Sequence, residues 1–134
     1  MTVLRADLVP GVAAADLSSY QYHFVYASAV GDSALDAPKV SLATDTQNTG
    51  GVTLYILYNA PTAGQAAALL PLGGNAKLKV GGTLAFGAEV MTGATGKGVA
   101  LAGSTKYALA RLLEAGVDGD IVEVETIKPS PMGS

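Results

Sequence analysis

Short apolar and β-branched runs, bounded by glycine, proline or polar turn residues, recur along the chain and limit its fold most strongly. In residues 20–26 aromatic side chains occupy almost every second position, and residues 121–127 alternate in a similar way. A period of two places successive side chains on opposite faces of a β-strand. Further runs of strand length cover residues 40–43, 52–58, 77–80, 83–86, 89–92 and 99–101. Many short strands with glycine-rich turns predict an all-β fold, a compact small barrel or sandwich.

Two segments allow either a helix or a strand when each is considered alone. Residues 62–70 are rich in alanine, the strongest helix former. In residues 107–113, Leu109, Leu112 and Leu113 have helical spacing, and Gly116 follows where a helix C-cap would lie. Local pattern alone therefore favours a helix in both places.

A weak internal repeat favours strands there instead. Residues 57–66 align with residues 112–121, and upstream residues 39–43 resemble residues 98–102. If the two halves share a fold, the β pattern of residues 121–127 predicts a strand at 66–72. The strand at 52–58 likewise predicts a strand at 107–113. An internal duplication is the favoured interpretation, with chance similarity in an alanine-rich chain as the alternative.

The chain of 134 residues is long enough for one domain with its own core. Residues 1–19 are expected to form an extended N-terminal arm, because Pro10-Gly11 interrupts its apolar residues. The β domain is placed at residues 20–128, and a flexible tail at residues 129–134.

Composition points toward assembly with other subunits. Hydrophobic residues make up 49% of the chain and charged residues only 14%, whereas about 25% charged is ordinary. Such a surface exposes many small apolar side chains, which a partner often covers. The eight basic residues are scattered, so no nucleic-acid partner is expected. No apolar run is long enough to span a membrane, and the N-terminus lacks a signal-peptide pattern.

Acidic residues concentrate near the end of the chain. Glu114, Asp118, Asp120, Glu123 and Glu125 have no basic residue among them. This asymmetry suits subunits that meet through complementary charged patches. A solvated acidic edge that discourages unwanted strand pairing explains it equally well.

Residues that could carry chemistry are sparse. His23 is the only histidine and there is no cysteine, so no multi-histidine or thiolate metal site can form. The glycine-rich residues 93–98 lack the spacing of a phosphate-binding loop and indicate a hairpin turn. Asp118-Gly119-Asp120 lacks the remaining ligands of a calcium loop and indicates a tight turn. The sequence predicts neither an enzyme nor a cofactor.

The order of several segments resembles tailed-bacteriophage capsid decoration (cement) proteins. These segments are residues 15–25, 58–66, 73–82, 87–90, 111–115 and 119–124. Together they span most of the chain, although the Ser28–Gly51 segment is longer than the short hairpin that is commoner in the family.

The resemblance implies a β-tulip-like fold and a homotrimer on the outer surface of a phage head. There it would clamp neighbouring subunits of the major capsid protein, after synthesis in the host cytoplasm. Family members need no cofactor and have no enzymatic activity. Because an N-terminal arm reaches along the shell in related architectures, the candidate capsid contacts are Val3, Leu4, Arg5, Leu8 and Val9.

Two other functional classes remain open at this point. A carbohydrate- or surface-binding β module of a phage fibre or adhesin would use Tyr20, Tyr22 or Tyr26 as a stacking platform. A hydrolase would have to use His23 as its base, without any nucleophile motif of the Gly-x-Ser-x-Gly type.

Overall fold

The computed structural model describes residues 8–29, 38–44, 53–101 and 108–127, which form ten β-strands and no helix. The all-β prediction is therefore confirmed. The first five strands are β1 Val9–Ala13, β2 Phe24–Ala29, β3 Lys39–Leu42, β4 Leu54–Leu57 and β5 Ala66–Pro71. The other five are β6 Asn75–Lys79, β7 Glu89–Thr92, β8 Gly98–Ala100, β9 Ala110–Leu112 and β10 Ile121–Thr126.

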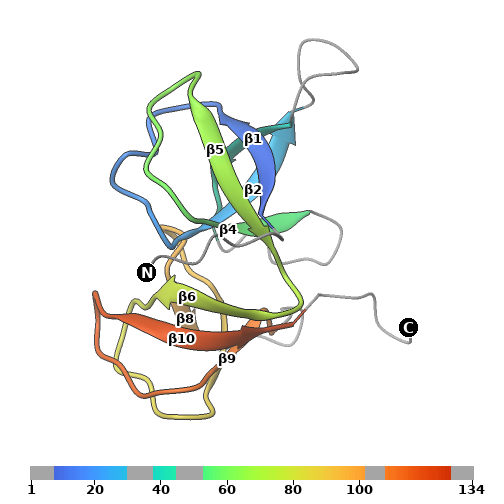
Figure 1. The fold of residues 1–134 in the computed structure, drawn as a ribbon. Helices are drawn as coiled ribbons and strands as arrows, with labels where there is room; N and C mark the ends of the chain where they lie inside the picture. The colour runs from blue at the N-terminus through green and yellow to red at the C-terminus, as the bar shows by residue number, and fades with distance from the viewer. Residues whose placement is uncertain (1–7, 30–37, 45–52, 102–107, 128–134) are drawn as a thin grey trace, which may run out of the picture.

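Strands β1 to β5 form a closed barrel, and β6 to β10 form a second sheet beside it. The barrel order is β1-β3-β2-β4-β5, with β5 pairing back onto β1. The second sheet has the order β6-β10-β9-β7-β8. Figure 1 shows the two groups one above the other, with the chain passing from β5 directly into β6. Below, β1–β5 are called the first repeat and β6–β10 the second repeat.

The second repeat has the same topology as the first, strand for strand. Replacing β1 to β5 by β6 to β10 in the barrel order reproduces the neighbours of the second sheet. The parallel pair β1–β3 has its counterpart in a parallel bridge between Val80 and Gly98, which joins the two edges of that sheet. Register agrees as well, since the pair Leu57–Leu69 of β4 and β5 recurs as Leu112–Val124 of β9 and β10.

The turns before β5 and β10 are held by the same hydrogen bonds. Asn59 Oδ1 accepts a hydrogen bond from the Ala68 N–H at 3.0 Å, and Glu114 Oε2 accepts one from the Glu123 N–H at 3.3 Å. The Thr62 N–H donates to Gln65 Oε1, as the Val117 N–H donates to Asp120 Oδ2. Gly64 and Gly119 hold equivalent left-handed positions with φ of 81° and 91°. The duplication is therefore present in backbone pairing and in side-chain capping.

The repeat alignment correctly predicts both ambiguous segments. Residues 66–72 contain β5 and residues 107–113 contain β9, so the helical alternative is wrong for both. The alignment of residues 39–43 with residues 98–102 is one residue out of register. Ala13 pairs with Val40 in the first repeat, and Val80 pairs with Gly98 in the second, so Gly98 is equivalent to Val40. The run at residues 83–86 forms only an isolated bridge, Leu84 to Gly116.

The N-terminal arm was predicted too long. Strand β1 lies between β3 and β5, and Leu17 beyond it is 2% exposed. Pro10 and Gly11 do not end the strand but lie inside it. A Cβ on Gly11 would lie 2.5 Å from Leu69 Cδ1, so close packing against β5 favours glycine there. Residues 9–19 belong to the first repeat.

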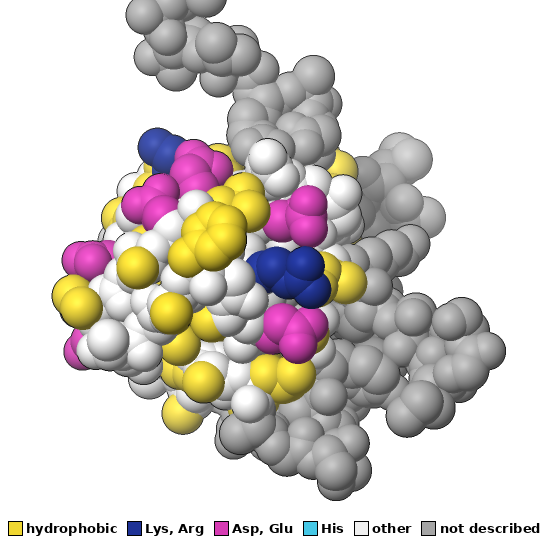
Figure 2. Space-filling view, turned by 90° about the horizontal axis from the view of Figure 1, so that it is seen from below, with side chains coloured by type: hydrophobic (Ala, Val, Ile, Leu, Met, Phe, Trp, Pro, Cys, Tyr) yellow, Lys and Arg dark blue, Asp and Glu magenta, His cyan; other side chains and the backbone are white. Residues whose placement is uncertain are grey.

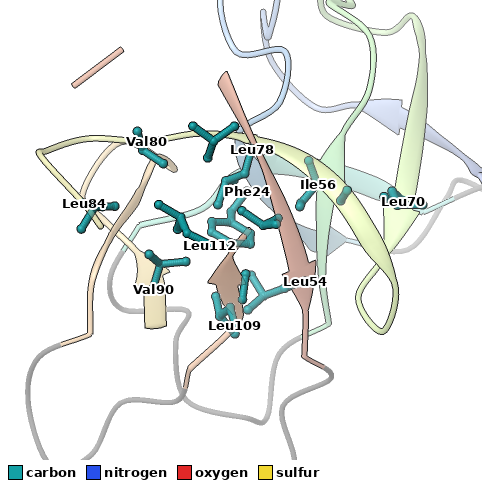
Figure 3. Close-up of a cluster of buried hydrophobic side chains, with 14 of the residues drawn as sticks. Phe24, Leu54, Ile56, Leu70, Leu78, Val80, Leu84, Val90, Leu109 and Leu112 are labelled. Atoms are coloured by element: carbon teal, nitrogen blue, oxygen red, sulfur yellow. The ribbon is translucent and has the colours of Figure 1, made fainter. Parts of the chain in front are cut away.

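Two clusters of buried side chains hold the molecule together. One fills the interior of the first repeat, around Leu17, Val25 and Leu69. The other fills the second repeat and also includes Phe24, Leu54, Ile56 and Leu70 from the first. Figure 3 shows Phe24 of the first repeat beside Leu78 and Leu112 of the second. Because successive strand residues point to opposite faces, β5 places Leu69 inside its own barrel and Leu70 against the other repeat.

Candidate interaction surfaces

The proposed capsid contacts divide between two parts of the chain. Val3, Leu4 and Arg5 lie outside the described residues. Leu8 is half-buried against the cluster shared by both repeats, and Val9 is half-buried against the interior of the first repeat. The side chains of Leu8 and Val9 therefore contribute to the fold of this chain.

His23 is enclosed where the two repeats meet. It is 3% exposed, its Nδ1 lies 3.1 Å from the Gln21 carbonyl oxygen, and its ring meets Tyr20 edge to face at 5.2 Å. Burial lowers the pKa of His23, and the nearby charges of Lys79 and Lys97 lower it further. Among the described residues, the groups that contact the His23 ring or shift its pKa include no carboxylate. These contacts favour a structural role for a neutral imidazole.

Tyr22 connects the repeats and has an unusual backbone conformation. Its φ of 65° is the only positive value among the described non-glycine residues, and Gly87 holds the equivalent position with φ of 83°. The Tyr22 carbonyl accepts a hydrogen bond from the Lys79 N–H at 2.8 Å. The ring meets Tyr58 edge to face at 5.1 Å, and the Tyr58 hydroxyl accepts a bond from the Lys77 N–H at 2.7 Å. A bulky residue here costs on the order of 1 kcal/mol.

The three tyrosines of the carbohydrate hypothesis do not form one platform. Tyr20 contacts His23, and Tyr26 packs on the core cluster shared by the repeats. Tyr22 alone lines a shallow pocket of about 360 Å³. The other lining residues are Lys77, Glu114, Ile121, Val122 and Glu123.

The outer face of the second repeat carries charges where the first repeat carries buried apolar residues. In the second repeat, Arg111 lies between Glu89 and Glu125 on its two neighbouring strands. At the equivalent positions of the first repeat, Ile56 lies between Phe24 and Leu70. Arg111 Nη2 lies 3.9 Å from Glu89 Oε2. Because both side chains are about half exposed, this ion pair contributes little to stability.

Large apolar side chains are exposed on the second repeat. Phe86 is 72% exposed, Val117 51%, Ile121 48% and Leu113 37%. The Gly87 N–H donates to the Leu112 carbonyl and Leu84 bridges Gly116, which places Phe86 beside residues 113–114.

Acidic residues lie beside these apolar side chains, and Lys79 lies opposite Ile121 across β6 and β10. Glu114, Asp118 and Asp120 are exposed on the same β9–β10 connection, and Lys97 Nζ lies 3.5 Å from Asp118. Figure 2 shows hydrophobic side chains with both acidic and basic ones beside them on this side of the molecule. We call Phe86, Leu113, Val117 and Ile121 with these three carboxylates the acidic-rimmed patch.

Sequence reasoning identified the acidic residues but not the exposed apolar ones. Residues 83–86 were expected to be a strand, and Leu113 fitted either secondary structure. The signal that could have found them is the repeat itself, since Thr62 and Ala66 align with Val117 and Ile121.

No site for a metal or a membrane-spanning helix is found within the described residues. They contain no group of three or more His, Asp or Glu side chains that could hold a metal ion. The described part of the chain also has no helix that could cross a bilayer. Residues 93–97 form the β7–β8 hairpin turn, with Gly96 at φ of 80°, and Gly98 begins β8.

Comparison with known proteins finds a similar fold. No protein-family model matches the chain, and no curated protein matches it by sequence. Among solved structures, the head fibre gp8.5 N base of bacteriophage phi29 matches with a TM-score of 0.66 and 14% sequence identity. The match covers 92% of this chain and 96% of that chain, so it extends over both repeats. At this identity the similarity establishes a common fold.

Proposed function

We propose that this chain is a structural protein of a tailed-phage head. In this proposal it binds the outer surface of the assembled capsid as a trimer and stabilises the lattice of the major capsid protein. The observation that carries the proposal is the fold, shared over almost the full length with a phage head fibre protein. The order of sequence segments that resembles capsid decoration proteins supports the same role.

The physical demands of this role are modest for each copy. A protein that binds the assembled shell and not the free subunits stabilises the shell by mass action, by about 2.7 kcal/mol per site at a hundredfold excess over Kd. Many copies on one shell act together, so moderate affinity at each position is sufficient. The role requires neither a cofactor nor a catalytic group.

The test uses undecorated heads of the phage whose genome encodes the chain. Purified chain should cosediment with these heads to a saturating ratio and raise the temperature at which they release DNA. Sedimentation equilibrium of the free chain should give the mass of a trimer. Heads that already carry the native protein are the control and should take up no more. A monomer that leaves undecorated heads unchanged at micromolar concentration would contradict the proposal.

The pocket at Tyr22 supports a second candidate, a saccharide-binding β module. An aromatic wall with carboxylate and ammonium groups nearby is a common arrangement for small polar ligands. Glycan-array binding that is lost in Tyr22→Gly and kept in Tyr26→Phe would favour this function. Glycine occupies the equivalent position of the second repeat, so the variant keeps a backbone compatible with the fold.

A further inference from the structure

The duplication provides an internal comparison for every surface position. The Tyr22 N–H donates to the Leu57 carbonyl, and the Gly87 N–H donates to the equivalent Leu112 carbonyl. Tyr22 and Gly87 are therefore equivalent, and so are the residues before them, Gln21 and Phe86. Shared turn bonds make Val117 equivalent to Thr62, and the strand starts make Ile121 equivalent to Ala66.

Except at Leu113, whose counterpart Tyr58 is a half-buried aromatic residue, the same positions in the first repeat carry no large apolar residue, and none of them carries a charge. Gln21, Thr62 and Ala66 are all exposed. Asn59 and Gln65 make the turn hydrogen bonds that Glu114 and Asp120 make in the second repeat. The fold therefore forms without the exposed apolar and acidic side chains of the acidic-rimmed patch.

We infer that the acidic-rimmed patch is the surface through which this chain docks on a protein partner that presents an apolar centre and a Lys- or Arg-rich rim. This inference rests on the proposed function and makes the capsid outer surface that partner. Exposed apolar side chains ringed by charge are typical of interaction sites. Basic residues of the partner opposite Glu114 and Asp120 would supply both the orientation and the electrostatic attraction, whereas Asp118 already lies 3.5 Å from Lys97 of this chain.

A second copy of this chain fits the patch less well. The chain carries a net charge of −3, so the acidic surfaces of two copies repel each other. Among the described basic residues, Lys97 and Arg111 are already near carboxylates, Lys77 and Lys79 lie on β6 opposite Glu123 and Ile121, and Lys39 lies on β3 of the first repeat. A partner with basic residues can pair with the carboxylates of the patch without this repulsion.

The test replaces patch residues by those that the first repeat carries at the same places. Phe86→Gln with Val117→Thr removes apolar surface. Glu114→Asn with Asp120→Gln removes two charges and keeps both turn hydrogen bonds, because Asn59 and Gln65 make them in the first repeat. Glu89→Gln with Glu125→Gln is the control, since it removes the same number of charges and neither residue belongs to the acidic-rimmed patch.

Binding to undecorated heads is measured by cosedimentation at low and at moderate salt. We expect F86Q/V117T to bind at least about tenfold more weakly at both concentrations. E114N/D120Q should weaken binding at low salt and flatten its salt dependence, because the attraction it removes is screened. E89Q/E125Q should stay within about threefold of the unchanged chain. Thermal unfolding should show that all three variants remain folded.

The outcomes distinguish failure of the docking-surface inference from failure of the proposed function. If the unchanged chain fails to bind heads, the proposed function and this inference both fail. If the unchanged chain binds and both patch variants bind equally well, the inference alone is overturned. Loss of a solution trimer in F86Q/V117T, with head binding retained, would assign the patch to contacts between copies and would also overturn it.

Discussion

Replacing Gly98 by valine tests whether the two repeats share one packing plan. The first repeat has Val40 at this position, and it has Gly11 where the second repeat has Leu78. A third equivalent pair is Leu69 and Val124. Each repeat thus places one glycine, one valine and one leucine at these three neighbouring positions, in a different order.

The structure sets the magnitude of the effect. A Cβ on Gly98 would lie 2.6 Å from Leu78 Cδ2, closer than side-chain atoms normally approach. Overpacking of this kind should lower the free energy of unfolding by about 1–3 kcal/mol in Gly98→Val. Leu78→Ala alone removes a fully buried side chain and should cost about 2–5 kcal/mol.

The double variant distinguishes shared packing from independent damage. In Leu78→Ala with Gly98→Val, the new valine occupies space that the leucine left, so the loss should be smaller than the sum by at least about 1 kcal/mol. Urea unfolding followed by circular dichroism measures all four proteins, with equal m-values as the check on two-state behaviour. Losses that add to within about 0.5 kcal/mol would refute the reasoning.

Three further outcomes follow from single positions. Gly96→Ala should lower the free energy of unfolding by about 2 kcal/mol more than Gly64→Ala, because both have positive φ but only Gly96 would bring a Cβ within 2.9 Å of the Phe24 carbonyl. Equal losses in urea unfolding would contradict this. Stability should fall as pH drops below 6.5 toward the lowered pKa of folded His23, since the unfolded chain takes up the proton first. His23→Gln should flatten that slope between pH 7.5 and 5.5 in the same assay. Thr126→Val should cost about 1–3 kcal/mol, because the Thr126 hydroxyl accepts two backbone N–H bonds at 2.7 and 2.9 Å, while a serine at this position should retain most of the stability.

The repeat was the most informative signal in the sequence. Local propensity alone favoured helices at residues 62–70 and 107–113, and only comparison between the halves predicted β5 and β9. The comparison succeeded because the turns before β5 and β10 use side-chain acceptors at equivalent positions. Leu112 and Leu113 illustrate why spacing misled: one is buried and the other is 37% exposed, as adjacent residues at a strand end can be.

Packing across strands could not be predicted in the same way. Pro10 and Gly11 look like a chain break, and the reason for Gly11 is visible only where Leu69 crosses it. The exposure of Phe86 likewise depends on residues 84–87 lying beside residues 112–116. The candidate site was therefore anticipated in its acidic residues, whose clustering is local in sequence, and missed in its apolar ones.

Glu89, Arg111 and Glu125 lie side by side on three neighbouring strands and affect whether a further repeat could pack on the second one. These residues stand where the first repeat presents Phe24, Ile56 and Leu70 to the second. A third unit added after β10 would have to bury carboxylates and a guanidinium to seat itself in the same way, at a large desolvation cost. In repeat proteins a polar outer face on the last unit keeps the array finite and soluble. Glu89, Arg111 and Glu125 therefore disfavour packing of another unit on this face in the way that the second repeat packs on the first.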